Sequence, residues 1–341
     1  REEAKPISGD DGLPEIERLA YHNEFSEPAS KGSIRKIDNR PAYIEFLLEQ
    51  ANVSALKPLK VVVNAGNGCA GLVLDVIEKH LPLEFIKLHH EPNGDFPHGV
   101  PNPLLPENRG PTVDAIREHK ADLGLAWDGD FDRCFFFDET GEFIEGYYIV
   151  GLLAKALLLR NPGQTIVFDP RLTWNTIEEV AEAGGKTAQS KSGHAFIKTR
   201  MREVDGLYGG EMSAHHYFRD FAYCDNGTLP WLLLCELLSN SDKPFSEMVK
   251  ERIAAYPASG EINRKVLDAD AVFADIEAKY ASSAVHIDRM DGLGFEYENW
   301  RFNLRKSNTE PVIRLNVESR ADQALMQEKT KELLAIIDAA G

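Results

Sequence analysis

The pattern of hydrophobic and polar positions predicts alternating strands and helices in the first part of the chain. The apolar run Val61–Val63 predicts a buried strand, and apolar residues at helical spacing between Leu72 and His80 predict a helix after it. A second strand follows at Leu83–Leu88, which completes a βαβ unit. Two further strands are expected at Asp122–Ala126 and Cys134–Phe137.

A second series of the same kind follows. We expect a buried helix over Tyr148–Leu159 and a strand at Thr165–Phe168. The next helix carries Ile177 and Val180 and should stop at Gly184-Gly185, because glycine commonly ends helices. A further apolar helix spans about Leu229–Leu238.

Beyond Pro257 the pattern mixes short strands with helices. Phe295–Leu304 resembles a hairpin arm, Val312–Val317 predicts a strand, and Met326, Leu333 and Ile337 share one face of a final helix. The predicted fold class is α/β, with two consecutive α/β mixed-sheet domains and a smaller α+β domain at the C-terminus.

The expected division of the chain follows these patterns. Residues 1–36 are polar and rich in Gly and Pro, and we interpret them as a linker or the remnant of another domain. The α/β domains are expected at 37–142 and 143–254, and the α+β domain at 255–341. His89–Pro111 is a long loop with six prolines, and loops of this length are usually functional.

Composition excludes several classes of protein. Among 341 residues, 38 are basic and 55 acidic, and the net charge of −17 argues against nucleic-acid partners and anionic membranes. The most apolar segment, Tyr147–Leu159, is interrupted by Lys155 and is shorter than a membrane span of about 20 residues. The four cysteines form no CxxC pair, so we expect reduced thiols in a cytoplasmic protein.

Gly66-Asn67-Gly68-Cys69-Ala70-Gly71 matches G-x-G-x-x-G between a strand and a helix, with Glu91 twenty residues further on. In this context the motif is typical of dinucleotide binding. The same glycines also suit a tight strand-to-helix turn. The motif alone does not decide between them.

Asp128, Asp130 and Asp132 follow a predicted buried strand at every second position. Three carboxylates in one turn can converge on a hard cation such as Mg²⁺, although a solvated acidic turn is the simpler alternative. An EF-hand is rejected because Arg133 stands where that loop needs Gly and because strands flank the turn. A phosphatase with an Asp-x-Asp nucleophile loop is disfavoured by Phe131 but stays open, with Asp128 as its nucleophile.

Two further loops carry polar groups in suggestive patterns. The segment Gly209–His216 brings together Glu211, Ser213 and His215, which suit recognition of a polyol. Arg305–Pro311 with Arg314 downstream combines cations, hydroxyls and an amide, as an anion cradle requires.

The local charge supports the interpretation of Arg305–Pro311 as an anion cradle. Between Arg301 and Arg314 there are four basic residues and one acidic residue, a local +3 in a chain of −17. A metal site, a polyol site and a phosphate site together indicate a phosphosugar substrate and phosphoryl transfer.

These three loops together resemble the α-D-phosphohexomutase family. Asp128–Arg133 is similar to its magnesium loop, Gly210–His215 to its sugar-specificity loop and Arg305–Pro311 to its phosphate-binding loop. The order and spacing fit from about residue 37 onward. The Met-Ser-Ala-His-His sugar loop and the stretch Tyr217–Asn226 resemble bacterial members of the capsule and O-antigen type, which act on mannose phosphates.

The resemblance implies interconversion of mannose 6-phosphate and mannose 1-phosphate through a phosphoserine and a hexose 1,6-bisphosphate, toward GDP-mannose. Mg²⁺ would be held by Asp128, Asp130 and Asp132, and Arg133 and His215 would be catalytic, with His215 the only candidate base. The implied substrate contacts are Arg171, His194, Glu211, Ser213, His215, Arg305, Ser307, Asn308, Thr309 and Arg314. In this family the glycine motif belongs to the second domain's fold and binds no nucleotide.

The sequence departs from the family at its first domain. The family's Thr/Ala-Ser-His-Asn-Pro loop, with the phosphorylated serine, does not occur: the pair His22-Asn23 is preceded by Tyr21 and followed by Glu24. We therefore expect a chain that lacks the nucleophile and is catalytically incomplete alone. A phosphoglucomutase, a dual-specificity enzyme and a phosphosugar-binding fragment remain as alternatives, and the oligomeric state is open.

Overall fold

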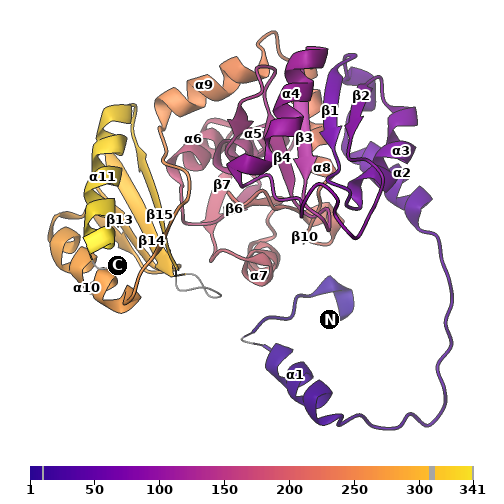
Figure 1. The fold of residues 1–341 in the computed structure, drawn as a ribbon, viewed down its shortest axis with the longest axis horizontal. Helices are drawn as coiled ribbons and strands as arrows, with labels where there is room; N and C mark the ends of the chain where they lie inside the picture. The colour runs from indigo at the N-terminus through magenta and orange to yellow at the C-terminus, as the bar shows by residue number, and fades with distance from the viewer. Residues whose placement is uncertain (10, 307–311, 340–341) are drawn as a thin grey trace.

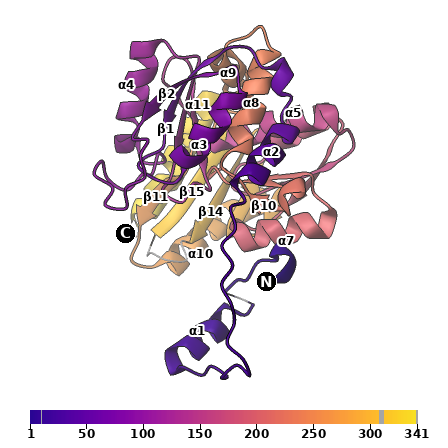
Figure 2. The same ribbon diagram turned by 90° about the vertical axis from the view of Figure 1, so that its right-hand side faces the viewer.

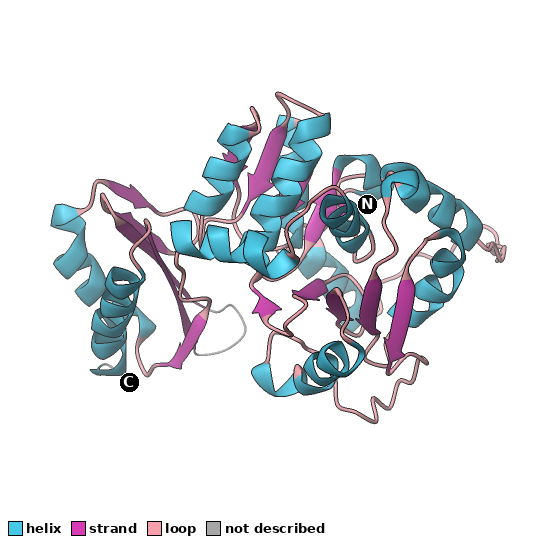
Figure 3. Ribbon diagram, turned by 90° about the horizontal axis from the view of Figure 1, so that it is seen from above, coloured by secondary structure: helices cyan, strands magenta, loops and turns pink. Residues whose placement is uncertain are grey.

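The computed structural model describes residues 1–9, 11–306 and 312–339. Three five-stranded sheets follow one another along the chain, and Figures 1 and 3 show the third, C-terminal sheet beside the other two. The first sheet consists of β1 (Lys60–Asn64), β2 (Glu84–Leu88), β3 (Leu123–Trp127), β4 (Cys134–Phe137) and β5 (Phe143–Ile144). Its helices are α2 (Arg40–Gln50), α3 (Ala70–Ile77) and α4 (Gly110–His119).

The first sheet has the order β2-β1-β3-β4-β5, with β1 parallel to β2 and β3, and with β4 and β5 antiparallel. Side chains alternate between its faces. Val61 and Val63 pack with the α2 and α3 side chains in the main core, while Val62 packs against Ala115 and Ile116 of α4. The uninterrupted apolar run therefore reflects helices on both faces.

The second sheet repeats this plan. It consists of β6 (Thr165–Phe168), β7 (Lys186–Gln189), β8 (Tyr208–Gly210), β9 (His216–Phe218) and β10 (Cys224–Asp225). Its order β10-β9-β8-β6-β7 has β6 parallel to β7 and β8 and then two antiparallel strands. Its helices are α5 (Gly146–Arg160), α6 (Trp174–Glu182), α7 (His194–Val204), α8 (Leu229–Ser239) and α9 (Phe245–Ala255).

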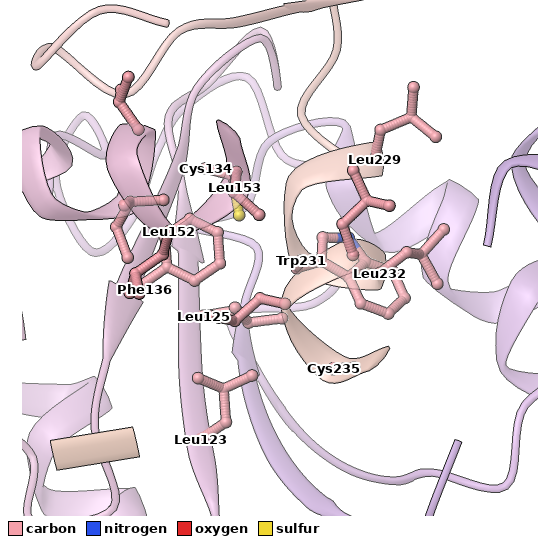
Figure 4. Packing of buried hydrophobic residues seen from close by; sticks show 14 of the residues in the cluster. Leu123, Leu125, Cys134, Phe136, Leu152, Leu153, Leu229, Trp231, Leu232 and Cys235 are labelled. Atoms are coloured by element: carbon pink, nitrogen blue, oxygen red, sulfur yellow. The ribbon is translucent and has the colours of Figure 1, made fainter. Parts of the chain in front are cut away.

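One hydrophobic core joins the first two sheets. Figure 4 shows Leu125 and Phe136 of the first sheet beside Leu153 of α5 and Trp231 of α8. All four of these side chains are at most 1% exposed. Because the two α/β units share this core, the loops between them are held in fixed relative positions.

The third sheet is antiparallel throughout, with the order β11-β15-β14-β13-β12. Its strands are β11 (Ile262–Lys265), β12 (His286–Asp288), β13 (Leu293–Glu296), β14 (Trp300–Lys306) and β15 (Val312–Ser319). The helices α10 (Ala269–Tyr280) and α11 (Gln323–Ala339) pack against it around a separate core. The fold class expected from the sequence is thus confirmed.

Buried polar groups attach the third sheet to the second unit. Arg301 donates to the carbonyl oxygens of Pro170 (2.9 Å) and Arg171 (3.1 Å), and it pairs with Glu318 at 2.7 Å. Glu318 also accepts from the backbone N–H of Thr173 at 2.7 Å. These polar contacts hold the C-terminal sheet against the loop that follows β6.

The N-terminal segment lies apart from the sheets, as Figures 1 and 2 show. It contains α1 (Leu13–His22) and leaves Tyr21, Phe25 and Ile34 exposed. Single-turn helices complete the chain at Glu2–Ala4, Val53–Ala55, Glu78–His80, Pro106–Asn108, Arg219–Phe221 and Ala281–Ser283. None of the helices in the described ranges combines the length and apolar character needed to cross a bilayer.

Two local expectations differ in detail from the structure. The long proline-rich loop ends in a single helical turn at Pro106–Asn108, and α4 begins at Gly110, one residue before the expected end of the loop. Pro111 stands in the first turn of that helix, where its missing N–H costs no hydrogen bond. The expected hairpin arm Phe295–Leu304 is parts of two strands, β13 and β14, joined by a short turn.

Candidate active site

The predicted site residues of the two α/β units sit where parallel strands end. Asp128 directly follows β3, Arg171 comes three residues after β6, His194 begins the helix after β7, and Glu211 directly follows β8. The carboxyl ends of parallel strands are the usual place for ligand sites in α/β sheets. The shared core brings both sets of loops together, and Arg133 pairs with His215 in a β-bridge between the two units.

The metal loop brings three carboxylates together. Oxygen atoms of Asp128, Asp130 and Asp132 all lie within 4.8 Å of one another. Phe131 takes a positive φ of 69°, and this turn carries the chain from Asp130 back toward Asp132. Burial and the neighbouring charges of Asp128 and Asp130 raise the pKa of Asp132 to about 7. Three mutually repelling carboxylates in one turn fit a hard divalent cation.

Arg133 partly neutralises the negative charge of the three carboxylates. Its Nε donates to Oδ2 of Asp128, and its backbone N–H donates to Oδ1 of the same residue at 3.2 Å. Asp128 is 1% exposed and therefore depends on these bonds. The guanidinium of Arg133 also lines the main cleft.

The glycine motif packs against the metal loop. A Cβ on Gly68 would lie 2.6 Å from the carbonyl oxygen of Gly129, and a Cβ on Gly71 would collide with the carbonyl oxygen of His90. The N–H of Cys69 donates to Gly129 at 3.3 Å. The motif's glycines thus permit close backbone approach, which is the tight-turn interpretation of this segment.

The sugar loop is rigidly held. Glu211 is 2% exposed, and its carboxylate accepts from the N–H of Gly193 at 2.8 Å and from the hydroxyl of Tyr217 at 2.6 Å. Burial raises its pKa, while Arg171, at 3.8 Å, acts in the opposite direction. Ser213 lies 3.4 Å from Nη2 of Arg171. Glu211 and Ser213 therefore present fixed polar atoms to the cleft.

Two histidines face each other between the metal and sugar loops. Nε2 of His194 and Nε2 of His215 are 3.0 Å apart, and each lies 3.7 Å from Oδ2 of Asp132. Nδ1 of His194 contacts Asp225 at 3.0 Å, and Nδ1 of His215 contacts the hydroxyl of Ser213 at 3.1 Å. Burial, with the nearby charges of His194 and Arg133, lowers the pKa of His215 to about 2, so its ring stays neutral near pH 7.

The C-terminal sheet contributes the cationic side of the cleft. Arg305 of β14 stands directly opposite Arg314 of β15 in the strand register. Nε of each is buried without a hydrogen-bond acceptor among the described residues. Free donors on two facing arginines fit an anion. The predicted contacts Ser307, Asn308 and Thr309 lie outside the described residues.

A single cleft of about 1110 Å³ is lined from three sides. The metal loop contributes Arg133, and the C-terminal sheet contributes Arg305 and Arg314. The second unit contributes Arg171, His194, Glu211, Ser213 and His215. The cleft therefore brings together eight of the substrate and catalytic candidates, with Asp132 directly behind the histidines.

Three acidic residues of the site were missed from the sequence. Asp169 holds Arg171 through bonds of 2.8 and 2.9 Å, Asp225 holds His194, and Glu261 lies among Arg171, Arg305 and Arg314. Asp169 had a signal, because it follows the end of a predicted strand as Asp128 does. Asp225 and Glu261 had none, since their partners are distant in sequence.

Comparison with known proteins agrees with this architecture. Three family profiles match in order: phosphoglucomutase/phosphomannomutase α/β/α domain II over residues 41–141, α/β/α domain III over 145–256, and the C-terminal domain over 261–335. A phosphomannomutase of Escherichia coli is 58% identical over 99% of this chain and 76% of its own length. A protein of Xanthomonas campestris named phosphohexose mutases is 54% identical over 98% of this chain and 74% of its own.

A solved structure of a phosphoglucomutase/phosphomannomutase family protein from Burkholderia thailandensis matches with a TM-score of 0.85 and 29% identity. The match covers 98% of this chain and 71% of that one. Fold, order of domains and sequence identity thus define the class as phosphohexomutase. The chain belongs to the phosphoglucomutase/phosphomannomutase family.

Proposed function

We propose that this chain carries the metal, sugar and phosphate sites of a phosphomannomutase, which interconverts mannose 6-phosphate and mannose 1-phosphate. The observation that carries the proposal is the cleft with a carboxylate-and-hydroxyl wall at Glu211 and Ser213 and an arginine wall at Arg305 and Arg314. The phosphate of a phosphosugar would face the arginine wall, and its hydroxyls would face the wall of Glu211 and Ser213. The close relatives named phosphomannomutase support the same activity.

The arginine wall would bind the phosphate already present on the sugar. Arg305 and Arg314 each offer a buried Nε donor, and Ser307, Asn308 and Thr309 are proposed to complete the cradle. Charge-assisted bonds of this kind fix orientation as well as affinity. The sugar would then lie across the cleft with its other end toward Arg133 and His215.

Glu211 and Ser213 would recognise the 3- and 4-hydroxyls of the sugar. Glu211 is already positioned by Gly193 and Tyr217, so little ordering is needed when the sugar binds. Arg171 would keep Ser213 in place, because Asp169 fixes its guanidinium and leaves Nη2 near the hydroxyl.

His215 would accept the proton of the attacking sugar hydroxyl on Nε2. Ser213 orients its ring through Nδ1, and the negative charge of a bound phosphosugar would raise its low pKa toward the range that a base needs. His194, held by Asp225, would keep the ring of His215 from turning away. Arg133 would neutralise charge on the transferring phosphoryl group, since positioning and charge neutralisation carry most of such reactions.

The residues of the metal loop fit Mg²⁺, and Asp128, Asp130 and Asp132 would hold it. Bound there, the ion would offset the charge of the phosphoryl group in transfer. A phosphatase that uses Asp128 as nucleophile is disfavoured, because both oxygens of that side chain accept bonds from Arg133.

The phosphorylated serine of the family is proposed to reside on a segment outside this sequence. On that proposal the chain binds phosphosugar but does not turn it over, and hexose 1,6-bisphosphate forms only in the longer protein. We further propose the domain divisions 37–142, 143–254 and 255–341. The boundary between the first two lies directly before β5, the last strand of the first sheet. We also propose that the protein is located in the cytoplasm and contributes to GDP-mannose synthesis.

Calorimetric titration of the chain with mannose 1-phosphate and Mg²⁺ tests the proposal. We expect binding that is lost in Arg305→Ala and weakened in Asp130→Asn. Arg289→Ala, an exposed arginine of the same domain paired with Glu277, is the matched control and should bind as the wild type does. Equal binding by Arg305→Ala and wild type would overturn the phosphate assignment, and unchanged Mg²⁺ dependence in Asp130→Asn would overturn the metal assignment.

Dual specificity is a second candidate, favoured by the relative named phosphohexose mutases. Glucose and mannose phosphates differ in the configuration of one hydroxyl, whereas Glu211 and Ser213 are proposed to contact two others. Titration with glucose 1-phosphate decides between the two. Affinity within about threefold of mannose 1-phosphate, a difference under 1 kcal/mol, would favour the dual enzyme.

A further inference from the structure

Three metal-ligating atoms converge at the edge of the acidic loop, and two of them are imidazole nitrogens rather than carboxylate oxygens. They are Nε2 of His194, Nε2 of His215 and Oδ2 of Asp132, and all lie within 4.8 Å of one another. The two nitrogens are 3.0 Å apart, and each is 3.7 Å from the oxygen. They come from three segments: the start of α7, the loop before β9 and the loop before β4.

These separations match the edges of a tetrahedron around a transition-metal ion. Zinc binds imidazole nitrogen and carboxylate oxygen at about 2.0–2.2 Å, which places neighbouring tetrahedral ligands about 3.3 Å apart. The three observed distances bracket that value, so small side-chain shifts would complete the site. The side chains are 41%, 14% and 28% exposed in the order His194, His215, Asp132, and the two histidines line the cleft.

The outer nitrogens of both rings are also held as metal-binding histidines usually are. Nδ1 of His194 lies 3.0 Å from Asp225, which Lys198 fixes in turn at 2.6 Å. Nδ1 of His215 lies 3.1 Å from the hydroxyl of Ser213. A carboxylate or hydroxyl on the outer nitrogen fixes the tautomer and leaves Nε2 free to ligate.

We propose that His194, His215 and Asp132 form a second metal site, selective for Zn²⁺ and similar transition ions, which shares Asp132 with the site of three carboxylates. Two imidazoles and one carboxylate suit Zn²⁺, Co²⁺ or Ni²⁺, whereas Mg²⁺ prefers oxygen ligands alone. The remaining coordination positions face the cleft and take water.

The site has a consequence that rests on the proposed function. An ion here occupies Nε2 of His215, the atom assigned to accept the substrate proton, and one oxygen of Asp132. Zn²⁺ therefore acts as an inhibitor of the mutase. The binding itself is independent of any turnover by the chain.

Co²⁺ is the probe for the test, because its visible absorption reports ligand type and geometry. Titration of the wild-type chain is expected to give one site with the strong bands of four- or five-coordinate Co²⁺, and Zn²⁺ should displace it. His194→Ala and His215→Ala should each lower the affinity at least about 10-fold. Asp130→Asn, which alters only the carboxylate site, should leave these bands in place.

Two controls separate this site from other metal ligands on the chain. His98→Ala removes one of the stacked pair His89 and His98, whose rings lie 3.8 Å apart, and should change nothing. A thiolate charge-transfer band would instead indicate Cys69 or Cys224, and with it the proposal would fail.

Zinc X-ray absorption on the wild-type chain needs no variant and so does not depend on how the variants fold. Two imidazole ligands per zinc are expected, and none would overturn the proposal. Affinity unchanged in both histidine variants, or lost only in Asp130→Asn, would overturn it as well. Mannose 1-phosphate titration remains the separate test of the proposed function, so either proposal can fail alone.

Discussion

Glu261 accepts a hydrogen bond from Arg305 across 3.1 Å, at the centre of the proposed phosphate cradle. The same carboxylate lies 3.3 Å from Nη1 of Arg171 and 3.4 Å from Nη1 of Arg314. Burial alone would raise the pKa of Glu261, but the three arginines hold it below its usual value. Glu261 is thus an internal counter-ion that keeps facing arginines together in the absence of phosphate.

Glu261→Gln should strengthen anion binding. The change removes one negative charge beside three arginines and keeps an acceptor of the same shape, so the local charge rises from +2 to +3. We expect inorganic phosphate to bind about 3- to 10-fold more tightly, or about 0.7–1.4 kcal/mol. Calorimetric titration with phosphate at two salt concentrations measures this. Weaker binding would mean that Glu261 chiefly positions the arginines.

Gly68→Ala should disturb the metal loop without touching any ligand. The new Cβ would lie 2.6 Å from the carbonyl oxygen of Gly129, so the backbone between Asp128 and Asp130 must shift. We expect Mg²⁺ affinity to fall and the free energy of unfolding to drop by about 1–3 kcal/mol, as overpacking does. Mn²⁺ binding followed by electron paramagnetic resonance and urea unfolding measure the two effects.

Gly94→Ala is the matched control for this substitution. Gly94 has open space where its Cβ would stand, so metal binding and stability should stay at the wild-type level. Normal Mn²⁺ binding in Gly68→Ala would contradict the role assigned to the glycine motif.

The hydrophobic pattern of the sequence predicted best those strands and helices that are buried on both faces or amphipathic. The run Val61–Val63 sits in β1 between α3 and α4, and each valine is fully buried. By contrast, β7 (Lys186–Gln189) is an edge strand with exposed residues, and β10 is two residues long. Neither carries a pattern of its own, because their position depends on pairing with β6 and β9.

The functional residues also fall into two groups, those that the sequence indicated and those that only the structure revealed. Asp128, Glu211 and Arg305 stand in compact motifs, so chemistry and spacing alone indicated them. Asp225 and Glu261 act through partners 31 and 44 residues away, His194 and Arg305, and only the folded chain brings these pairs together. Local sequence predicts ligands on one loop. It does not predict counter-ions that come from a distant segment of the same domain.

Glu318→Gln should loosen the C-terminal domain. The side chain is fully buried, pairs with Arg301 and accepts from Thr173, and the change leaves a buried arginine without its charged partner. Removing one member of such a pair costs about 3–5 kcal/mol. Because the C-terminal core is separate from the main core, denaturant unfolding should split into two transitions. Glu328→Gln, an exposed glutamate of α11, should keep the wild-type curve.

Glu145→Gln should flatten the pH dependence of stability. Burial raises the pKa of Glu145, Arg109 partly offsets this, and the charge of Glu261 adds to it. The folded chain therefore binds this proton more tightly than the unfolded chain, whose glutamate titrates near about 4.3. This group's contribution to stability thus falls as pH rises from there through the folded pKa.

The variant carries no titrating group at this position, so it should be more stable than the wild type at pH 7 and equal to it at pH 4. Urea unfolding of both proteins between pH 4 and pH 8 measures the difference. Glu142→Gln, an exposed neighbour, should parallel the wild type throughout. A wild-type advantage over Glu145→Gln at pH 7 would mean that the attraction of Arg109 outweighs the burial of this carboxylate.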